Sequence, residues 1–174
     1  SERDICTKFI TPAILKAGWD KDSQIREEVS FTAGKVIVRG KLVSRGKGKR
    51  ADYILYYKNN IPIAVIEAKD NKHSVGSGIQ QAIEYAETLD IPFVFSSNGD
   101  AFLFHDRTVD LGKKEIELPL DEFPTPQELW EKFKKFKQIE DAETEKVYIL
   151  NYHQDVTSNK EPRYYHRIAF NRAV

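Results

Sequence analysis

Short apolar runs, each bounded by turn residues, recur between residues 27 and 120 and are typical of β-strands. The run IPIAVI at residues 61–66 is too short for a helix and has a proline at its second position, so it predicts a buried strand. Asn98-Gly99 lies between two such runs and predicts a tight hairpin. The predicted strands are two within residues 27–43 around Gly34, one at 51–57, one at 61–69, two within 92–106, and an edge strand at 113–120.

Three segments place apolar residues at helical spacing. Residues 3–17 predict a helix that is kinked at Pro12 and ends before the glycine of a GWD turn, and residues 77–89 predict a second helix. Residues 125–137 predict a third, because a threonine is a good N-cap and the following proline suits the first helical position. We therefore expect an α/β domain with a central mixed β-sheet flanked by helices.

The C-terminal part of the sequence differs from the rest. Residues 138–160 are polar and predict a linker with a short strand at residues 147–152. The stretch that follows is amphipathic and predicts a helix that is cut off by the end of the sequence. We expect a first domain over residues 1–137, the linker, and the start of a second domain at residues 161–174 of a longer protein.

Composition places the chain among globular proteins, with 174 residues of which 40% are hydrophobic and 31% are charged. Lys+Arg and Asp+Glu number 27 each, so a nucleic-acid surface has to be a local patch. The single cysteine, Cys6, excludes an internal disulfide and fits a reducing compartment. Since the sequence has neither an apolar stretch of membrane-spanning length nor a signal-peptide pattern, we expect a cytoplasmic protein with no membrane partner.

The predicted strand at residues 61–69 ends with a carboxylate and an ammonium, Glu67 and Lys69, on the same face of the sheet. If Asn59-Asn60 forms a two-residue hairpin loop, Asp52 falls opposite Glu67, and Arg50 falls opposite Lys69. Opposed Cβ atoms lie about 4.5–5.5 Å apart, so the two carboxylates repel each other unless a cation lies between them.

Two carboxylates completed by water form the hard oxygen site that Mg²⁺ prefers. Lys69 can then orient a metal-bound water or steady developing negative charge, which points to phosphodiester hydrolysis. The alternative is that the acidic residues are solvated strand ends and that Lys69 forms a surface ion pair of little energetic value. The four histidines show no metal-ligand spacing, which argues against zinc.

Two neighbouring features fit a nuclease. Gln81 and Tyr85 share one face of the predicted helix, where Gln81 can contact substrate or hold Lys69 and Tyr85 can meet a phosphate. Their alternative is an ordinary surface amide and a core-edge aromatic residue. The glycine-broken loop SRGKGKR before Asp52 is a candidate DNA-binding segment or, alternatively, a solvated connector. Its basic residues are Arg45, Lys47, Lys49 and Arg50.

The set formed by Asp52 and Glu67-Ala68-Lys69 resembles the PD-(D/E)XK nuclease motif, although an alanine precedes Asp52 where the motif name has proline. The segments RADYILYY, IAVIEAK, QQAIEYA and FVFSSNG, in this order, resemble the N-terminal nuclease domain of type I restriction enzyme R (motor) subunits. AGWD and FPTPQELW fit the same pattern, and PRYYHRIAFNRAV resembles the segment that leads into the family's ATP-dependent helicase-like motor.

This resemblance implies a restriction-endonuclease-like fold, with Asp52 and Glu67 as Mg²⁺ ligands and Lys69 as the catalytic lysine. It implies that Gln81 and Tyr85 form the family's Q-x-x-x-Y motif, associated with DNA handling, and leaves open whether Glu2 or Asp4 adds a further acid. The implied partners are double-stranded DNA and the methyltransferase and specificity subunits of a restriction-modification complex. Use of ATP would belong to the motor, because the sequence has no Walker motif.

Two other functions remain open at this point: a repair or recombination nuclease of the same superfamily, and a catalytically silent DNA-docking domain. Metal-dependent nicking would separate an enzyme from a docking domain. A Walker motif downstream of Val174 would separate a restriction subunit from a repair nuclease.

Overall fold

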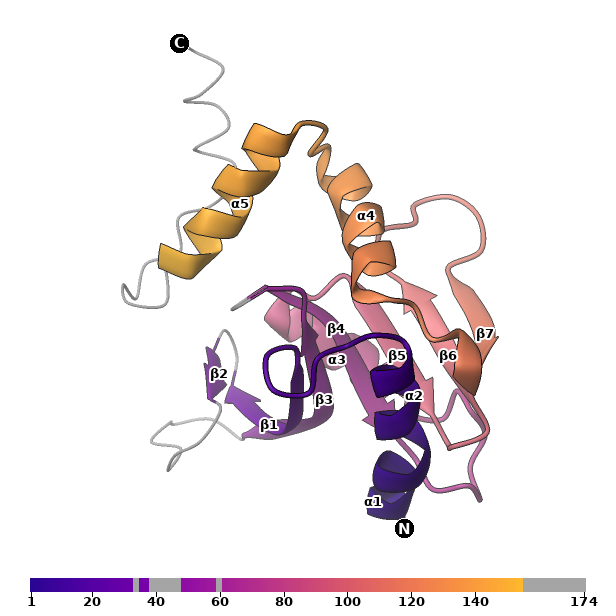
Figure 1. Ribbon diagram of the computed structural model, residues 1–174. Helices are drawn as coiled ribbons and strands as arrows, with labels where there is room; N and C mark the ends of the chain where they lie inside the picture. The colour runs from indigo at the N-terminus through magenta and orange to yellow at the C-terminus, as the bar shows by residue number, and fades with distance from the viewer. Residues whose placement is uncertain (33–34, 38–47, 59–60, 155–174) are drawn as a thin grey trace.

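Seven strands form one mixed sheet in the part of the chain that the structure describes, with the order β2-β1-β3-β4-β5-β6-β7 (Figure 1). The structure is a computed structural model and describes residues 1–32, 35–37, 48–58 and 61–154, without the side chains of 35–37 and 151–154. The strands are β1 Ile25–Thr32, β2 Lys35–Ile37, β3 Lys49–Tyr56, β4 Pro62–Ala68, β5 Phe93–Ser97, β6 Ala101–Asp106 and β7 Glu115–Pro119. The predicted α/β architecture with a mixed sheet is confirmed.

The central strand β4 carries the apolar run from which a buried strand was predicted. Ala64, Val65 and Ile66 are completely buried, and β4 pairs with β3 on one side and with β5 on the other. The pairing of β4 with β5 is parallel, because the chain crosses between them through helix α3 (Ile79–Leu89), whereas the other neighbouring strands are antiparallel.

Two buried clusters lie on opposite faces of this sheet and define three layers. One cluster, which includes Trp19, Phe95 and Trp130, packs the N-terminal helices and helix α4 (Pro126–Lys137) against the sheet. The other, which includes Val65 and Ala82, packs α3 against the opposite face (Figure 1). The N-terminal helices are α1 (Glu2–Ile5), the π-helical turn η1 (Cys6–Ile10) and α2 (Thr11–Lys16), and a short 3₁₀ turn, η2 (Leu120–Glu122), precedes α4.

The interruption predicted at Pro12 takes the form of the π-helical turn. The backbone N–H of Thr11 donates to the carbonyl of Cys6, five residues back, directly before the proline that has no N–H to donate. The helix ends at Lys16 and is followed by Gly18 with φ +97°, the conformation that glycine adopts easily.

The short strand predicted at residues 147–152 is wrong, because this segment belongs to helix α5 (Ala142–Gln154). Asp141 begins the helix by accepting the backbone N–H of Thr144 at 2.7 Å. Tyr148 is buried against the rings of Trp130 and Phe133 on α4. The apolar run therefore packs as one face of a helix against aromatic residues that are distant in the sequence.

The expected domain boundaries stay a prediction. Part of the expected linker forms α5, while the expected amphipathic helix lies within residues 155–174, outside the described residues. Among the described residues, no helix is both long enough and apolar enough to span a membrane.

Candidate active site

The β3–β4 hairpin has the predicted register at the end that carries the acidic residues. The opposed pairs there are Tyr53 with Ile66, Ile54 with Val65, and Leu55 with Ala64. Nearer the loop, Tyr56 lies opposite Pro62, so Ile63 is an extra residue that bulges from β4. The predicted register is therefore one residue off at the loop end, and the predicted loop residues 59–60 lie outside the described residues.

Asp52 and Glu67 lie one position beyond the last pair of this ladder. The Asp52 Oδ2 atom accepts the backbone N–H of Ala68 at 2.8 Å, and Glu67 Oε2 lies 3.5 Å from the backbone nitrogen of Asp52. In a continuous antiparallel ladder, these two N–H groups would donate to backbone carbonyls. The two carboxylates therefore meet where the regular backbone ladder ends, and each accepts or approaches a backbone N–H group of the other strand.

This pair of carboxylates is costly to ionise. Glu67 is only 4% exposed, and its burial together with the nearby Asp52 charge raises its pKa to about 8. Burial also raises the pKa of Asp52, against the opposing effect of the hydrogen bond from Ala68. A cation between the two carboxylates would remove the repulsion that the buried pair creates.

The oxygen donors of this pair fit a hard divalent cation such as Mg²⁺. In the described part of the chain, no group of three or more His, Cys, Asp and Glu side chains is arranged to hold a metal ion. A cation held by Asp52 and Glu67 would therefore complete its coordination with backbone carbonyls, water or substrate oxygens, as Mg²⁺ commonly does.

Lys69 follows β4 directly, and its side chain is held by two neighbours. Its Nζ atom donates to Gln81 Oε1 at 3.4 Å and lies 3.6 Å from Glu2 Oε1 in α1. Its backbone N–H donates to the carbonyl of Ser97 on β5 at 2.8 Å, which fixes the start of the side chain. Lys69 is therefore positioned by three elements of the fold.

Gln81 and Tyr85 lie on α3 and continue this network. Gln81 Nε2 donates to Tyr85 Oη at 2.6 Å, so the amide links the tyrosine hydroxyl to Lys69. Tyr85 is buried and meets the ring of Phe31 edge-on at 5.1 Å. The structure thus brings both residues into contact with the predicted catalytic lysine, directly for Gln81 and through Gln81 for Tyr85.

The predicted basic segment is only partly described, since Arg45 and Lys47 lie outside the described residues. Lys49 and Arg50 are exposed at the start of β3, and Lys49 Nζ lies 6.0 Å from the centre of the Tyr85 ring. Arg50 pairs with Ser30 of β1. The expected pairing of Arg50 with Lys69 is wrong, because the described β3–β4 ladder ends before it reaches these residues.

Of Glu2 and Asp4, only Glu2 lies near Lys69, and which of the two adds an acid to the metal site stays a prediction. Glu2 reaches Lys69, whereas Asp4 bonds to the N-terminal amine at 3.1 Å and lies 3.9 Å from Lys8. The sequence shows two acids in one helical turn, and nothing in their spacing distinguishes them.

Nothing in the sequence indicated that Ser96 is a neighbour of the site, yet it lies beside Glu67 in the parallel β4–β5 ladder. Its hydroxyl donates to the carbonyl of Val75 at 2.8 Å and accepts the backbone N–H of Gly78 at 3.1 Å. A Cβ atom on Gly78 would lie 3.0 Å from the Ser96 hydroxyl and 3.3 Å from Glu67 Cγ. The close approach of the α3 N-terminus to Glu67 therefore depends on a glycine and a buried serine.

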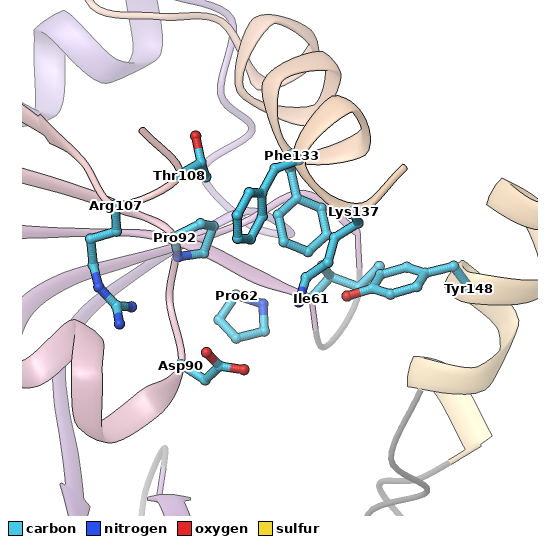
Figure 2. A pocket seen from close by; sticks show the side chains of 10 residues that line it. Ile61, Pro62, Asp90, Pro92, Arg107, Thr108, Phe133, Lys137 and Tyr148 are labelled. Carbon is cyan, nitrogen blue, oxygen red and sulfur yellow. The ribbon is translucent and has the colours of Figure 1, made fainter. Parts of the chain in front are cut away.

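A pocket of about 100 Å³ lies at the other end of the sheet (Figure 2). Residues at the start of β4, near the start of β5 and on α4 line it, among them Pro62, Pro92 and Phe133. None of the predicted site residues that the structure describes lines this pocket. The acidic pair and Lys69 instead lie at the opposite ends of β4 and β5.

Comparisons with known proteins show which family the chain resembles. A family model described as the type I restriction enzyme R protein N terminus matches residues 36–113, which include Asp52, Glu67, Lys69, Gln81 and Tyr85. The type I restriction enzyme EcoAI endonuclease subunit of Escherichia coli is 51% identical over 175 residues, covering 100% of this chain and 21% of that protein.

A solved structure is also similar. It is a fragment described as an HsdR subunit of a type I restriction enzyme from Vibrio vulnificus YJ016, with a TM-score of 0.68 and 38% identity. The match covers 99% of this chain and 32% of that structure. The chain therefore spans about a fifth of the length of the first relative and a third of the second.

Proposed function

Because this chain belongs to the family of N-terminal domains of type I restriction enzyme R proteins, we propose that it is an endonuclease domain that hydrolyses phosphodiester bonds of double-stranded DNA. The observation that carries the proposal is the convergence of the buried Asp52 and Glu67 carboxylates next to Lys69. Similarity to R proteins supports a role in restriction rather than in DNA repair.

The proposed cofactor is Mg²⁺, held by Asp52 and Glu67. Both side chains would bind as ionised carboxylates, and the charge of the cation would offset the repulsion that raises their pKa values. When bound, Mg²⁺ supplies Lewis-acid stabilisation of the phosphate and activates water. The backbone contact from Ala68 fixes one oxygen of Asp52, which limits the directions from which a cation can approach.

Lys69 has the proposed role of catalytic lysine. Its ammonium would steady the negative charge that develops on the phosphate as the bond breaks. Gln81 and Glu2 hold the ammonium from two sides, so little reorganisation is needed when the phosphate arrives. Tyr85 contributes by fixing the orientation of the Gln81 amide.

DNA binding is proposed for the basic residues at the start of β3 and in the segment before it. Lys49 and Arg50 are exposed there, three and two positions before Asp52, where they can meet phosphates that flank the cleaved bond. Arg45 and Lys47 would extend this contact. Gln81 and Tyr85 are proposed to affect DNA mainly through Lys69.

The wider assembly is also a proposal, because the chain spans only part of its relatives. ATP-driven translocation would belong to other domains of the full-length subunit. Methyltransferase and specificity subunits would supply target recognition.

Replacing one carboxylate tests the proposed function. In the full-length subunit assembled with its partners, Asp52→Asn should abolish Mg²⁺-dependent cleavage of plasmid DNA, because one of the two charged ligands is lost. ATP hydrolysis measured in Mg²⁺ should remain, and so should DNA binding measured in Ca²⁺. Glu117→Gln on the exposed edge strand β7 is the matched control, because it also replaces a carboxylate with its isosteric amide. Cleavage at the wild-type rate by Asp52→Asn would refute the assignment.

A further inference from the structure

Glu28 has an unusual backbone conformation for a residue inside a strand. Its φ is 50°, in the left-handed region that side chains other than glycine seldom adopt. The other non-glycine residues with positive φ in the described part of the chain are Asp90 and Gln138, which directly follow α3 and α4. A left-handed residue is common at a helix end, but within β1 it needs a separate reason.

The register of β1 and β3 places this residue beside the proposed active site. Glu27 lies opposite Tyr53, and Val29 lies opposite Ala51, so Glu28 occupies the position that faces Asp52. Neither Glu28 nor Asp52 takes part in the pairing of β1 with β3, which is otherwise regular.

The two strands change faces at this point. Ile25 and Tyr53 belong to the buried cluster under the N-terminal helices, whereas Val29 and Ala51 belong to the cluster under α3. In an uninterrupted strand, residues 25 and 29 would lie on the same face, as would 51 and 53. The irregularity at Glu28 and Asp52 therefore shifts the alternation of side chains in both strands, next to the point where Asp52 reaches across to β4.

The Glu28 side chain also makes a contact that leads to Lys69. Its Oε1 atom accepts a hydrogen bond from Arg3 Nη1 at 2.8 Å. Arg3 follows Glu2 in α1, and the Glu2 carboxylate lies 3.6 Å from Lys69 Nζ. Glu28 therefore lies opposite Asp52 across β1 and β3, and it is linked to Lys69 through Arg3 and Glu2 of α1.

We propose that Glu28 is a positioning residue of the nuclease site. Its left-handed backbone lets β1 and β3 change faces beside Asp52, and its carboxylate holds α1 so that Glu2 stays at Lys69. This inference rests on the proposed nuclease function.

The ion pair itself contributes little to folding. The side chains of Arg3 and Glu28 are 75% and 50% exposed, and pairs of this kind stabilise proteins only weakly. Helix α1 is also held by Ile5 and η1 by Phe9, which approach the Gly99 turn so closely that a Cβ atom there would lie 3.1 Å and 3.0 Å from them. Variants of Glu28 should therefore fold, and their main effect should be on the site.

The test uses the full-length subunit assembled with its partners. Glu28→Gln removes the charge of the side chain. Glu28→Gly removes the whole side chain and places a residue that adopts a left-handed φ easily. Gln138→Gly is the matched control, because Gln138 has a similar φ of 58°. Both glycine variants should melt at or above the wild-type temperature. Glu28→Gln and Glu28→Gly should cleave saturating DNA about tenfold more slowly, since small displacements of catalytic groups are costly, while Gln138→Gly should cleave normally.

Hydrogen exchange of the metal-free subunit gives a second measurement that does not depend on cleavage. The amides of residues 4–6 donate to Ser1, Glu2 and Arg3, and they should exchange about two- to fivefold faster in Glu28→Gln and Arg3→Gln, as expected for loss of an exposed ion pair. Exchanging the charges, with Arg3→Glu and Glu28→Arg together, should restore much of the protection and of the cleavage rate.

Normal cleavage and unchanged exchange in Glu28→Gln would overturn the positioning role. If Asp52→Asn also cleaved normally, the nuclease assignment would fail instead, and the exchange of the amides of residues 4–6 would still decide whether Glu28 positions α1.

Discussion

The buried carboxylate of Glu67 should make the metal-free chain less stable as the pH rises. Its folded-state pKa of about 8 lies above the ordinary value of 4.5, because burial and the charge of Asp52 disfavour ionisation. Below pH 4.5, Glu67 is protonated in both the folded and unfolded states, so its burial carries no ionisation cost. Between pH 4.5 and about 8, only the unfolded state ionises readily, and the free energy of unfolding falls.

The size of this effect follows from the width of the interval. Each pH unit within it lowers the free energy of unfolding by about 1.4 kcal/mol. At pH 7, the accumulated loss is about 3 kcal/mol as an upper value, because Asp52 shares the proton and reduces the part that belongs to Glu67 alone. Glu67→Gln cannot ionise and should escape this loss.

The assay is urea unfolding of the metal-free chain at several pH values, comparing wild type with Glu67→Gln. The difference in unfolding free energy should grow in favour of the variant from pH 5 to pH 8, and adding Mg²⁺ should stabilise the wild type more than the variant. Glu117→Gln is the control, since Glu117 is exposed on β7 and should show no such trend. A difference between wild type and Glu67→Gln that stays constant across this pH range would refute the reasoning.

Two further predictions concern Lys69 and the basic segment. Lys69→Ala should lower the cleavage rate of the assembled enzyme with little change in DNA affinity, because its charge acts on the transition state; an equal loss of affinity with normal turnover would make it a phosphate anchor. Neutralising Arg45, Lys47 and Lys49 together should flatten the slope of log affinity against log salt by about 2–3 if all three contact phosphates. That slope is measured on a duplex of arbitrary sequence in Ca²⁺, and an unchanged slope would mean that the contacts lie elsewhere.

Much of the fold was predictable because local signals and burial agreed. The apolar run of β4 and the Thr125 N-cap each act over a few residues and have the predicted structure. The predicted hairpin at Asn98-Gly99 also joins β5 to β6, but its turn is longer than two residues, because the innermost pair is Ser97 with Phe102. The capping box of Thr125 with Glu128 closes within one turn, so no distant contact can alter it easily. The register that places Asp52 near Glu67 was predicted from an assumed two-residue loop, and it holds at the acidic end because the bulge at Ile63 offsets the one-residue difference at the loop end.

Long-range packing decided the remaining features. Residues 147–152 could pair as a strand or pack as a helix, and the aromatic rings of α4 favour the helix. Glu2 rather than Asp4 meets Lys69 because of how α1 lies on the sheet, and the change of face at Glu28 depends on two strands acting together. The sequence by itself determined the strands of the central sheet and the carboxylates at the ends of the β3–β4 hairpin, because those properties depend mainly on neighbours along the chain. Only the tertiary structure decided which charges surround the site, because that depends on contacts between segments that the sequence keeps apart.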